Sequence, residues 1–129
     1  MIDRLDAAGL RPTHQRVALA TLLFSGDARH ITAEQLYTEA KSAGLKVSFA
    51  TIYNVVNLFT EYGLLREIAI KPGIALYDTN VAEHSHFYFE DTQQLVDIPG
   101  TIPFLDFLPP PPSGTIIKRI DLIIRVRAT

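Results

Sequence analysis

The stretch from Ser48 to Gly63, SFATIYNVVNLFTEYG, constrains the fold of this chain more than any other segment. Ser48 is a good helix N-cap because its hydroxyl accepts a hydrogen bond from a free backbone N–H of the first turn, and Gly63 suits the left-handed residue that ends a helix. Apolar residues recur between these two ends at helical spacing, which predicts one buried stripe. The stripe consists of Ile52, Val55, Val56, Phe59 and Tyr62.

The other side of this predicted helix carries hydroxyl, phenol and amide groups and little formal charge. These groups belong to Ser48, Thr51, Tyr53, Asn54 and Asn57. Such groups form hydrogen bonds with base edges in a DNA major groove, so this face is a candidate DNA-reading surface. An ordinary amphipathic helix with a neutral solvent face explains the same pattern.

The neighbouring segments favour the DNA-binding interpretation. Three helices are predicted before Ser48, and the third opens with Thr32 and Gln35 at the spacing of a capping box. A glycine-containing turn joins it to the Ser48 helix, which is the helix-turn-helix order. Two apolar strands around Pro72-Gly73 then predict a hairpin in the position of a wing. Residues 1–78 are therefore predicted to form a winged helix-turn-helix DNA-binding domain.

The remaining residues predict a hinge and a small second domain. Residues 79–83 have no periodicity and read as the hinge, and residues 84–129 form the second domain. Its predicted elements are a strand over 84–91, a strand over 93–98, a brief helical segment over 102–108 and, after four prolines, a strand over 115–127. Three strands are too few to bury this much apolar surface, so we expect a homodimer through residues 84–127. The predicted fold class is α+β, a winged helix-turn-helix domain followed by a small α/β dimerisation domain.

The composition limits which metal ligands and which partners are possible. The chain of 129 residues has no cysteine, which excludes disulfides and a thiolate zinc site, so any metal must bind nitrogen and oxygen ligands. The net charge of −2 argues against a general nucleic-acid coat. No apolar run reaches the roughly 20 residues that cross a bilayer, and the N-terminus does not resemble a signal peptide. We expect a cytoplasmic protein without a membrane partner.

A candidate ligand site centres on His84-Ser85-His86. Residues two apart in a strand point the same way, so both imidazoles can reach one ion, and imidazole with oxygen ligands suits iron, manganese or zinc. Asp78, Asp97 and His30 could complete such a site if the hinge folds the two domains together. In the alternative interpretation, His30 is an exposed residue before a helix and the two aspartates merely end strands.

These segments resemble the ferric uptake regulator (Fur) family. The resemblance rests on GLRPTHQRVALATLLF, RHITAEQLY, VSFATIYNVVNLFTEYGLL and HSHFYFED, in this order and spacing. Asn54, the YDTN of 77–80 and the LVDIP of 95–99 are most similar to the iron response regulator (Irr) branch of alpha-proteobacteria. The resemblance implies a dimeric iron-responsive transcription factor that binds an inverted-repeat DNA operator.

The resemblance also implies roles for individual residues. The family's inter-domain metal ligands fall on His30, Asp78, His84, His86 and Asp97. In the DNA-binding domain, Arg11 falls where a basic residue enters the minor groove, and Tyr53 where an aromatic ring meets a thymine methyl. Asn54 replaces a groove-reading arginine, which implies a different operator preference because an asparagine amide favours adenine.

Three departures from the family matter for cofactors. The cysteine-bound structural zinc is impossible here, and Ser85 stands where the second metal site of the family has a carboxylate. Irr proteins typically carry three consecutive histidines implicated in haem sensing, so haem ligation would depend on His84 and His86 alone. By resemblance, an Irr-type protein acts when iron is scarce and is withdrawn when haem is plentiful, whereas a Fur-type protein binds DNA with metal in place. The sequence favours the Irr type.

Two other classes of protein compete with a metal- or haem-responsive regulator. A small metalloenzyme of the cupin type would use His84, His86 and a carboxylate to hold iron, but cupins need two packed sheets and the first 65 residues here are predicted to be helical. A DNA-binding module without effector would bind its operator equally well with and without metal or haem. The sequence favours the regulator and predicts that the protein is not an enzyme.

Overall fold

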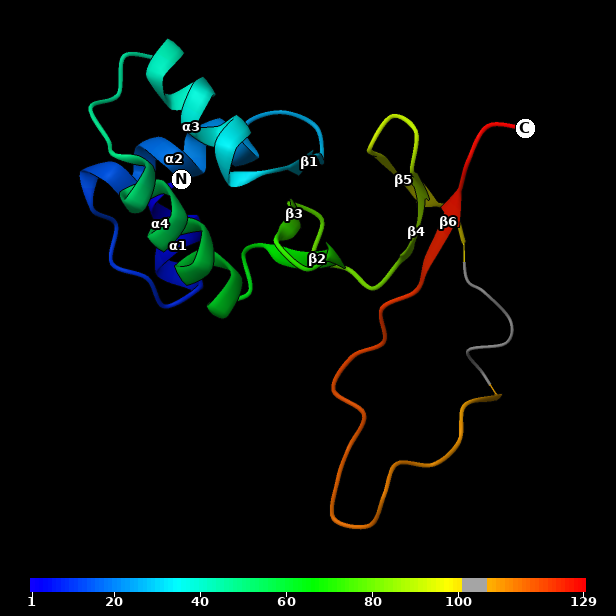
Figure 1. Cartoon of the computed structure of the whole chain (residues 1–129). Coiled ribbons are helices and arrows are strands. Elements are labelled where there is room, and N and C mark those ends of the chain that lie inside the picture. The colour runs from blue at the N-terminus through cyan, green and yellow to red at the C-terminus, as the bar shows by residue number, and fades with distance from the viewer. Residues whose placement is uncertain (101–106) are drawn as a thin grey trace. The chain divides into compact units, whose positions relative to one another are not determined.

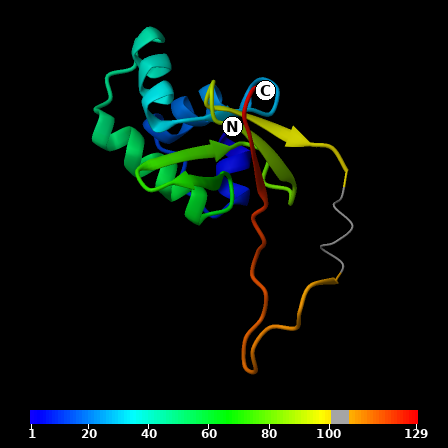
Figure 2. The ribbon, with the colours of Figure 1, turned by 45° about the vertical axis from the view of Figure 1, so that its right-hand side comes forward.

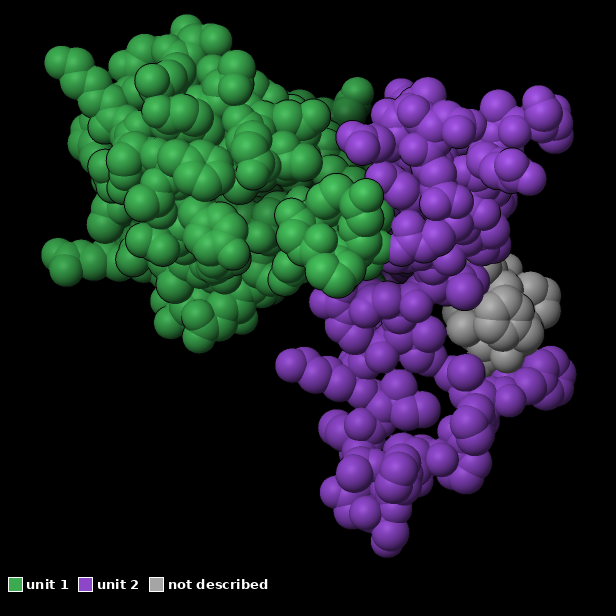
Figure 3. Space-filling model, in the orientation of Figure 1, with its two compact units in different colours: residues 1–81 green, residues 82–129 purple. Residues whose placement is uncertain are grey.

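The computed structural model describes residues 1–100 and 107–129, which form two units (Figures 1 and 3). Unit 1 is Met1–Val81 and unit 2 is Ala82–Thr129. The predicted hinge over 79–83 stays a prediction. No helix among the described residues is both long enough and apolar enough to cross a membrane.

Four helices form most of unit 1. They are α1 (Ile2–Ala7), α2 (His14–Phe24), α3 (Ala33–Ser42) and α4 (Phe49–Glu61). Side-chain caps start three of them. Thr13 caps α2, and the two predicted caps are present: Thr32 and Gln35 form a full capping box on α3, and the Ser48 hydroxyl accepts from the Thr51 N–H at 3.1 Å. Gly63 has a φ of +79°, and the Leu64 N–H after it donates to the Phe59 carbonyl, which closes α4 as expected for a left-handed glycine.

A three-stranded antiparallel sheet completes unit 1 (Figures 1 and 2). Its strands are β1 (His30–Ile31), β2 (Arg66–Lys71) and β3 (Ile74–Asp78), in the order β1-β3-β2. The hairpin of β2 and β3 around Pro72-Gly73 confirms the predicted wing. The sequence does not predict β1, because two residues are too few to show a periodic pattern.

The core of unit 1 lies between the helices and the sheet. Four of the five residues of the predicted α4 stripe are buried, namely Ile52, Val55, Val56 and Phe59. The prediction is wrong for Tyr62, which is 44% exposed. Tyr62 is the C-cap of the helix and lies at the edge of the stripe, where its ring is only partly covered by the core.

Unit 2 is a second three-stranded sheet, in the order β5-β4-β6. Its strands are β4 (Ser85–Phe89), β5 (Gln94–Ile98) and β6 (Ile123–Val126). The antiparallel pair of β4 and β5 was expected from the sequence, and β6 runs parallel to β4. Among the described residues of this unit, the buried ones are Ser85, His86 and Tyr88.

The predicted strand over 115–127 is wrong for most of its length. Only Ile123–Val126 pair in a ladder, while residues 107–122 form an irregular loop that extends away from the sheet of unit 2 (Figures 1 and 2). The β-branched composition of this segment favours a strand, but β4 has only five residues and offers no partner further upstream. Residues 102–106 of the predicted helical segment lie outside the described residues.

Candidate metal and DNA-binding sites

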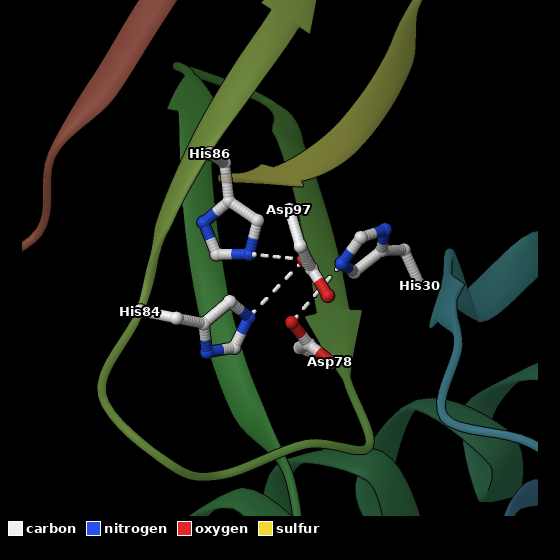
Figure 4. A group of neighbouring side chains, drawn as sticks. All are labelled: His30, Asp78, His84, His86 and Asp97. Carbon is white, nitrogen blue, oxygen red and sulfur yellow. Dashed lines mark hydrogen bonds and ion pairs between the residues drawn. The ribbon is translucent and has the colours of Figure 1, made fainter. Parts of the chain in front are cut away.

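In unit 1 an imidazole faces a carboxylate across two strands. His30 of β1 and Asp78 of β3 are direct partners in the antiparallel register, and Nε2 of His30 lies 3.0 Å from Oδ2 of Asp78 (Figure 4). Asp78 is 1% exposed, and its Oδ1 accepts from the Asn80 N–H at 2.9 Å. A buried carboxylate needs such partners, and the pair offers a metal one nitrogen and one oxygen ligand.

Residues next to His30 hold β1 in place. The Arg29 N–H donates to the Thr79 hydroxyl at 2.9 Å, and the Thr79 N–H donates to the Arg29 carbonyl at 3.0 Å. The Arg29 guanidinium also forms a two-pronged ion pair with Glu39 of α3. These contacts fasten a strand of two residues both to the sheet and to a helix.

In unit 2 the same cross-strand arrangement recurs with a second histidine. His86 of β4 is the register partner of Asp97 of β5, and Nε2 of His86 lies 3.2 Å from Oδ1 of Asp97 (Figure 4). Nε2 of His84 lies 3.2 Å from the same oxygen, and the two imidazole rings are 4.4 Å apart. The prediction that both histidines point to one side of the strand is therefore confirmed.

The tautomer of His84 indicates what this set of side chains can hold. Nδ1 of His84 donates to the Ala82 carbonyl oxygen at 2.6 Å, because a carbonyl can only accept. In the neutral imidazole Nε2 then carries a lone pair, and it faces a carboxylate oxygen that also carries lone pairs. This contact needs a proton or a cation between the two atoms, and two imidazoles with one carboxylate are also a donor set that fits a divalent metal ion.

The polar face of α4 is open to solvent. Ser48, Asn54 and Asn57 are exposed, Tyr53 is 49% exposed, and Thr51 is half-buried. The hydroxyls of Ser48 and Thr51 bond to each other at 3.0 Å, so both are partly engaged in capping the helix. Arg11 lies on the exposed connector between α1 and α2.

Two polar residues beside this face were not predicted from the sequence. A shallow hollow next to α4 is lined by Gln15 and Arg16 from the first turn of α2, together with Thr51 and Asn54. Both residues belong to α2, which precedes the helix-turn-helix pair of α3 and α4, so the local sequence pattern did not place them beside α4.

Tyr77 connects β3 to α4. Successive residues of a strand point to opposite faces, so Tyr77 points toward the helices while its neighbour Asp78 faces His30. The Tyr77 hydroxyl lies 3.4 Å from Oδ1 of Asn57. Burial, with smaller effects of nearby negative charge, raises the pKa of Tyr77 to about 12, so its phenol remains a hydrogen-bond donor at neutral pH.

The chain belongs to the Ferric uptake regulator family, because residues 7–101 match the model of that family. It is 32% identical over 96 residues to the peroxide-responsive repressor PerR of Staphylococcus aureus strain Mu50, and this match covers 74% of the chain. The chain spans 64% of the length of that relative. A match to the PerR of Staphylococcus epidermidis has the same identity.

Solved structures agree with this assignment. The ferric uptake regulator of Pseudomonas aeruginosa with manganese is 26% identical, with a TM-score of 0.76 over 98% of this chain and 96% of the other. The Vibrio cholerae ferric uptake regulator also has a TM-score of 0.76, at 19% identity over 98% of each chain, and shows likeness of fold. The predicted fold class is confirmed, and these relatives are regulators and repressors rather than enzymes.

The Arg29–Glu39 ion pair makes a testable contribution to stability. The hydrogen bond from Arg29 lowers the pKa of Glu39 below its ordinary value near 4.5. The stabilisation is therefore present above that ordinary pKa and is lost as the pH falls through the lowered one. We expect Glu39→Gln to cost about 0.5–1 kcal/mol at pH 7, because the pair is partly exposed, and less at pH 3.

Urea unfolding of the wild type and Glu39→Gln at both pH values measures this difference. Glu61→Gln, an exposed glutamate at the end of α4, is the matched control and should change the free energy of unfolding by less than about 0.5 kcal/mol. A cost for Glu39→Gln that stays the same at pH 3 would contradict the assignment.

Proposed function

We propose that this protein is a metal-responsive transcriptional regulator that binds an inverted-repeat DNA operator as a homodimer. The proposal rests on two sets of imidazole and carboxylate side chains, one set in each unit, in a chain whose first unit is a winged helix. Family membership supports both parts, since the relatives include a repressor and a regulator with manganese.

We further propose that one divalent ion is shared by the two sets. Unit 1 offers two ligands, His30 and Asp78, and unit 2 offers three, His84, His86 and Asp97; each contributes one ligand atom. Neither set alone reaches the four to six ligands that zinc, iron or manganese ions take, whereas together they do. A metal bound by both sets would restrict the hinge and set the angle between DNA-reading and dimer-forming parts.

The dimer is proposed from the small core of unit 2. Apolar side chains of its strands and loop are substantially exposed, among them Phe89, Val96, Ile117 and Ile124. A sheet of three short strands buries too little apolar surface for independent stability, and a second copy would cover these side chains. A two-fold dimer would present two α4 helices to the two halves of an inverted repeat.

Whether the metal strengthens or weakens operator binding depends on its effect on the hinge. Fixing the hinge reduces the conformational entropy that is lost when two α4 helices dock on DNA, so we propose that the metal strengthens operator binding. The opposite, Irr-type control by haem, is the second candidate, and Asn54 in place of the family's arginine favours it. Haem would use His84 and His86, but their shared contact with Asp97 suits a divalent ion better.

Calorimetric titration with Mn(II) tests the shared metal ion. We expect His84→Ala combined with His86→Ala to lower the Mn(II) affinity by at least about 100-fold, because two of five ligands are removed. Asp78→Asn should also weaken binding, by about tenfold or more, although it lies in the other unit.

His14→Ala is the control, because His14 is an exposed histidine outside both sets, and it should bind Mn(II) like the wild type. If Asp78→Asn and His30→Ala both bind Mn(II) with wild-type affinity, the ion belongs to unit 2 alone and the sharing is disproved.

Substitution of Tyr53 tests the DNA-reading role of α4. We expect Tyr53→Ala to weaken binding to an A/T-rich inverted repeat, obtained by in vitro selection, by roughly tenfold, because a contact to a base edge is lost. Binding to scrambled DNA depends on phosphate contacts and should stay the same.

Fluorescence anisotropy at fixed salt measures both affinities. Tyr62→Ala is the matched control, since Tyr62 is a similarly exposed tyrosine at the far end of α4. An equal loss on operator and scrambled DNA would refute a base-reading role for Tyr53.

A further inference from the structure

Phe49 is an unexpected residue on the polar face of α4. It is the first residue of the helix, directly after the Ser48 cap, and its side chain is 39% exposed. Single exposed apolar side chains are common on protein surfaces and need no explanation. Phe49, however, is not isolated.

Three residues of α4 form one row along the exposed side of the helix. Phe49, Tyr53 and Asn57 are spaced by four residues, so their side chains lie one above another. The rings of Phe49 and Tyr53 are 6.5 Å apart and tilted by 31°. Phe49 therefore extends the candidate DNA-reading surface by one turn toward the start of the helix.

A tyrosine from α3 fixes the orientation of the Phe49 ring. Tyr37 meets it edge to face, at 5.7 Å between centroids and an interplanar angle of 87°. The Lys41 ammonium lies 5.0 Å from the centre of the Tyr37 ring on the same helix. Aromatic pairs with this geometry stabilise each other beyond their buried area, so Phe49 is oriented while a large part of its surface remains available.

We propose that Phe49 is a second DNA-reading residue, which contacts the 5-methyl group of a thymine next to the base read by Tyr53, and that Tyr37 is its positioning residue. This inference rests on the proposed DNA-binding function. An exposed phenylalanine offers no hydrogen bond, so among the groups on the floor of the major groove it fits the thymine methyl. The row then offers two aromatic rings for apolar contacts, from Phe49 and Tyr53, and one amide, from Asn57.

A cycle that combines a protein variant with a base analogue tests the proposal. Each thymine of one operator half-site is replaced in turn by uracil, which lacks only the methyl group, and affinity is measured with wild type and Phe49→Ala at fixed salt. At one position we expect the uracil operator to bind the wild type about threefold to tenfold more weakly than the thymine operator does. Phe49→Ala should bind both operators with the same affinity. Tyr53→Ala should remain sensitive to uracil at that position.

Two further variants distinguish the loss of a DNA contact from a folding defect. Phe49→Leu keeps an apolar side chain and should retain most of the methyl sensitivity, which shows that the loss in Phe49→Ala is not a general defect of α4. Tyr37→Leu should reduce the methyl sensitivity at the Phe49 position while binding to scrambled DNA stays the same. Thermal unfolding followed by circular dichroism confirms that each variant is folded.

The outcomes distinguish this inference from the proposed function. If wild type prefers the operator to scrambled DNA but every uracil effect is equal in wild type and Phe49→Ala, Phe49 reads no methyl group and this inference alone is overturned. If wild type shows no preference for the operator with or without Mn(II), the proposed function fails and the inference fails with it.

Discussion

Antiparallel pairing of an imidazole with a carboxylate is the interaction on which the candidate metal site depends. In such a ladder, residues directly opposite each other hold their side chains on the same face and close together. His30 is opposite Asp78 in one sheet, and His86 is opposite Asp97 in the other. A shift of one residue in either register would turn the ligands to opposite faces, so strand register specifies the ligand set.

The alternation of strand side chains also gives β3 two roles. Asp78 faces His30 on one side of the sheet, and Tyr77 reaches Asn57 of α4 from the other side. One strand therefore has a candidate metal ligand and a contact to the candidate DNA-reading helix at neighbouring positions. Unit 1 thus contains a short physical connection between the candidate metal ligand Asp78 and the candidate DNA-reading helix.

The sequence predicts those parts of the structure that local patterns specify. The caps at Thr32 and Ser48 and the turn at Gly73 each require particular side chains or backbone angles, so they can be recognised before the fold is known. Strand β1 could not be recognised, because its two residues pair only through contact with a distant strand. The segment over 115–122 has strand-forming residues but no partner strand, which local propensity cannot show.

The candidate ligands were predictable for a different reason. The strand period predicts that His84 and His86 share a side, and the structure confirms this. The contact of His30 with Asp78 depends on the unpredicted β1, so the residues alone left it open, and the family resemblance supplied it. The sequence did not predict roles for Phe49 and Tyr77. Phe49 is exposed and Tyr77 is buried because of the way the helices and the sheet pack, and no sequence pattern shows this.

We propose that a divalent metal ion bound by these residues controls operator affinity. The most direct test measures the Kd of the wild-type protein for the selected inverted repeat at fixed salt, in chelator, with Mn(II), and with haem. We predict that Mn(II) strengthens binding by roughly tenfold or more and that haem in chelator has no effect. Equal affinity with Mn(II) and with chelator, or tight binding in chelator that haem alone reverses, would disprove control of operator affinity by a divalent metal ion.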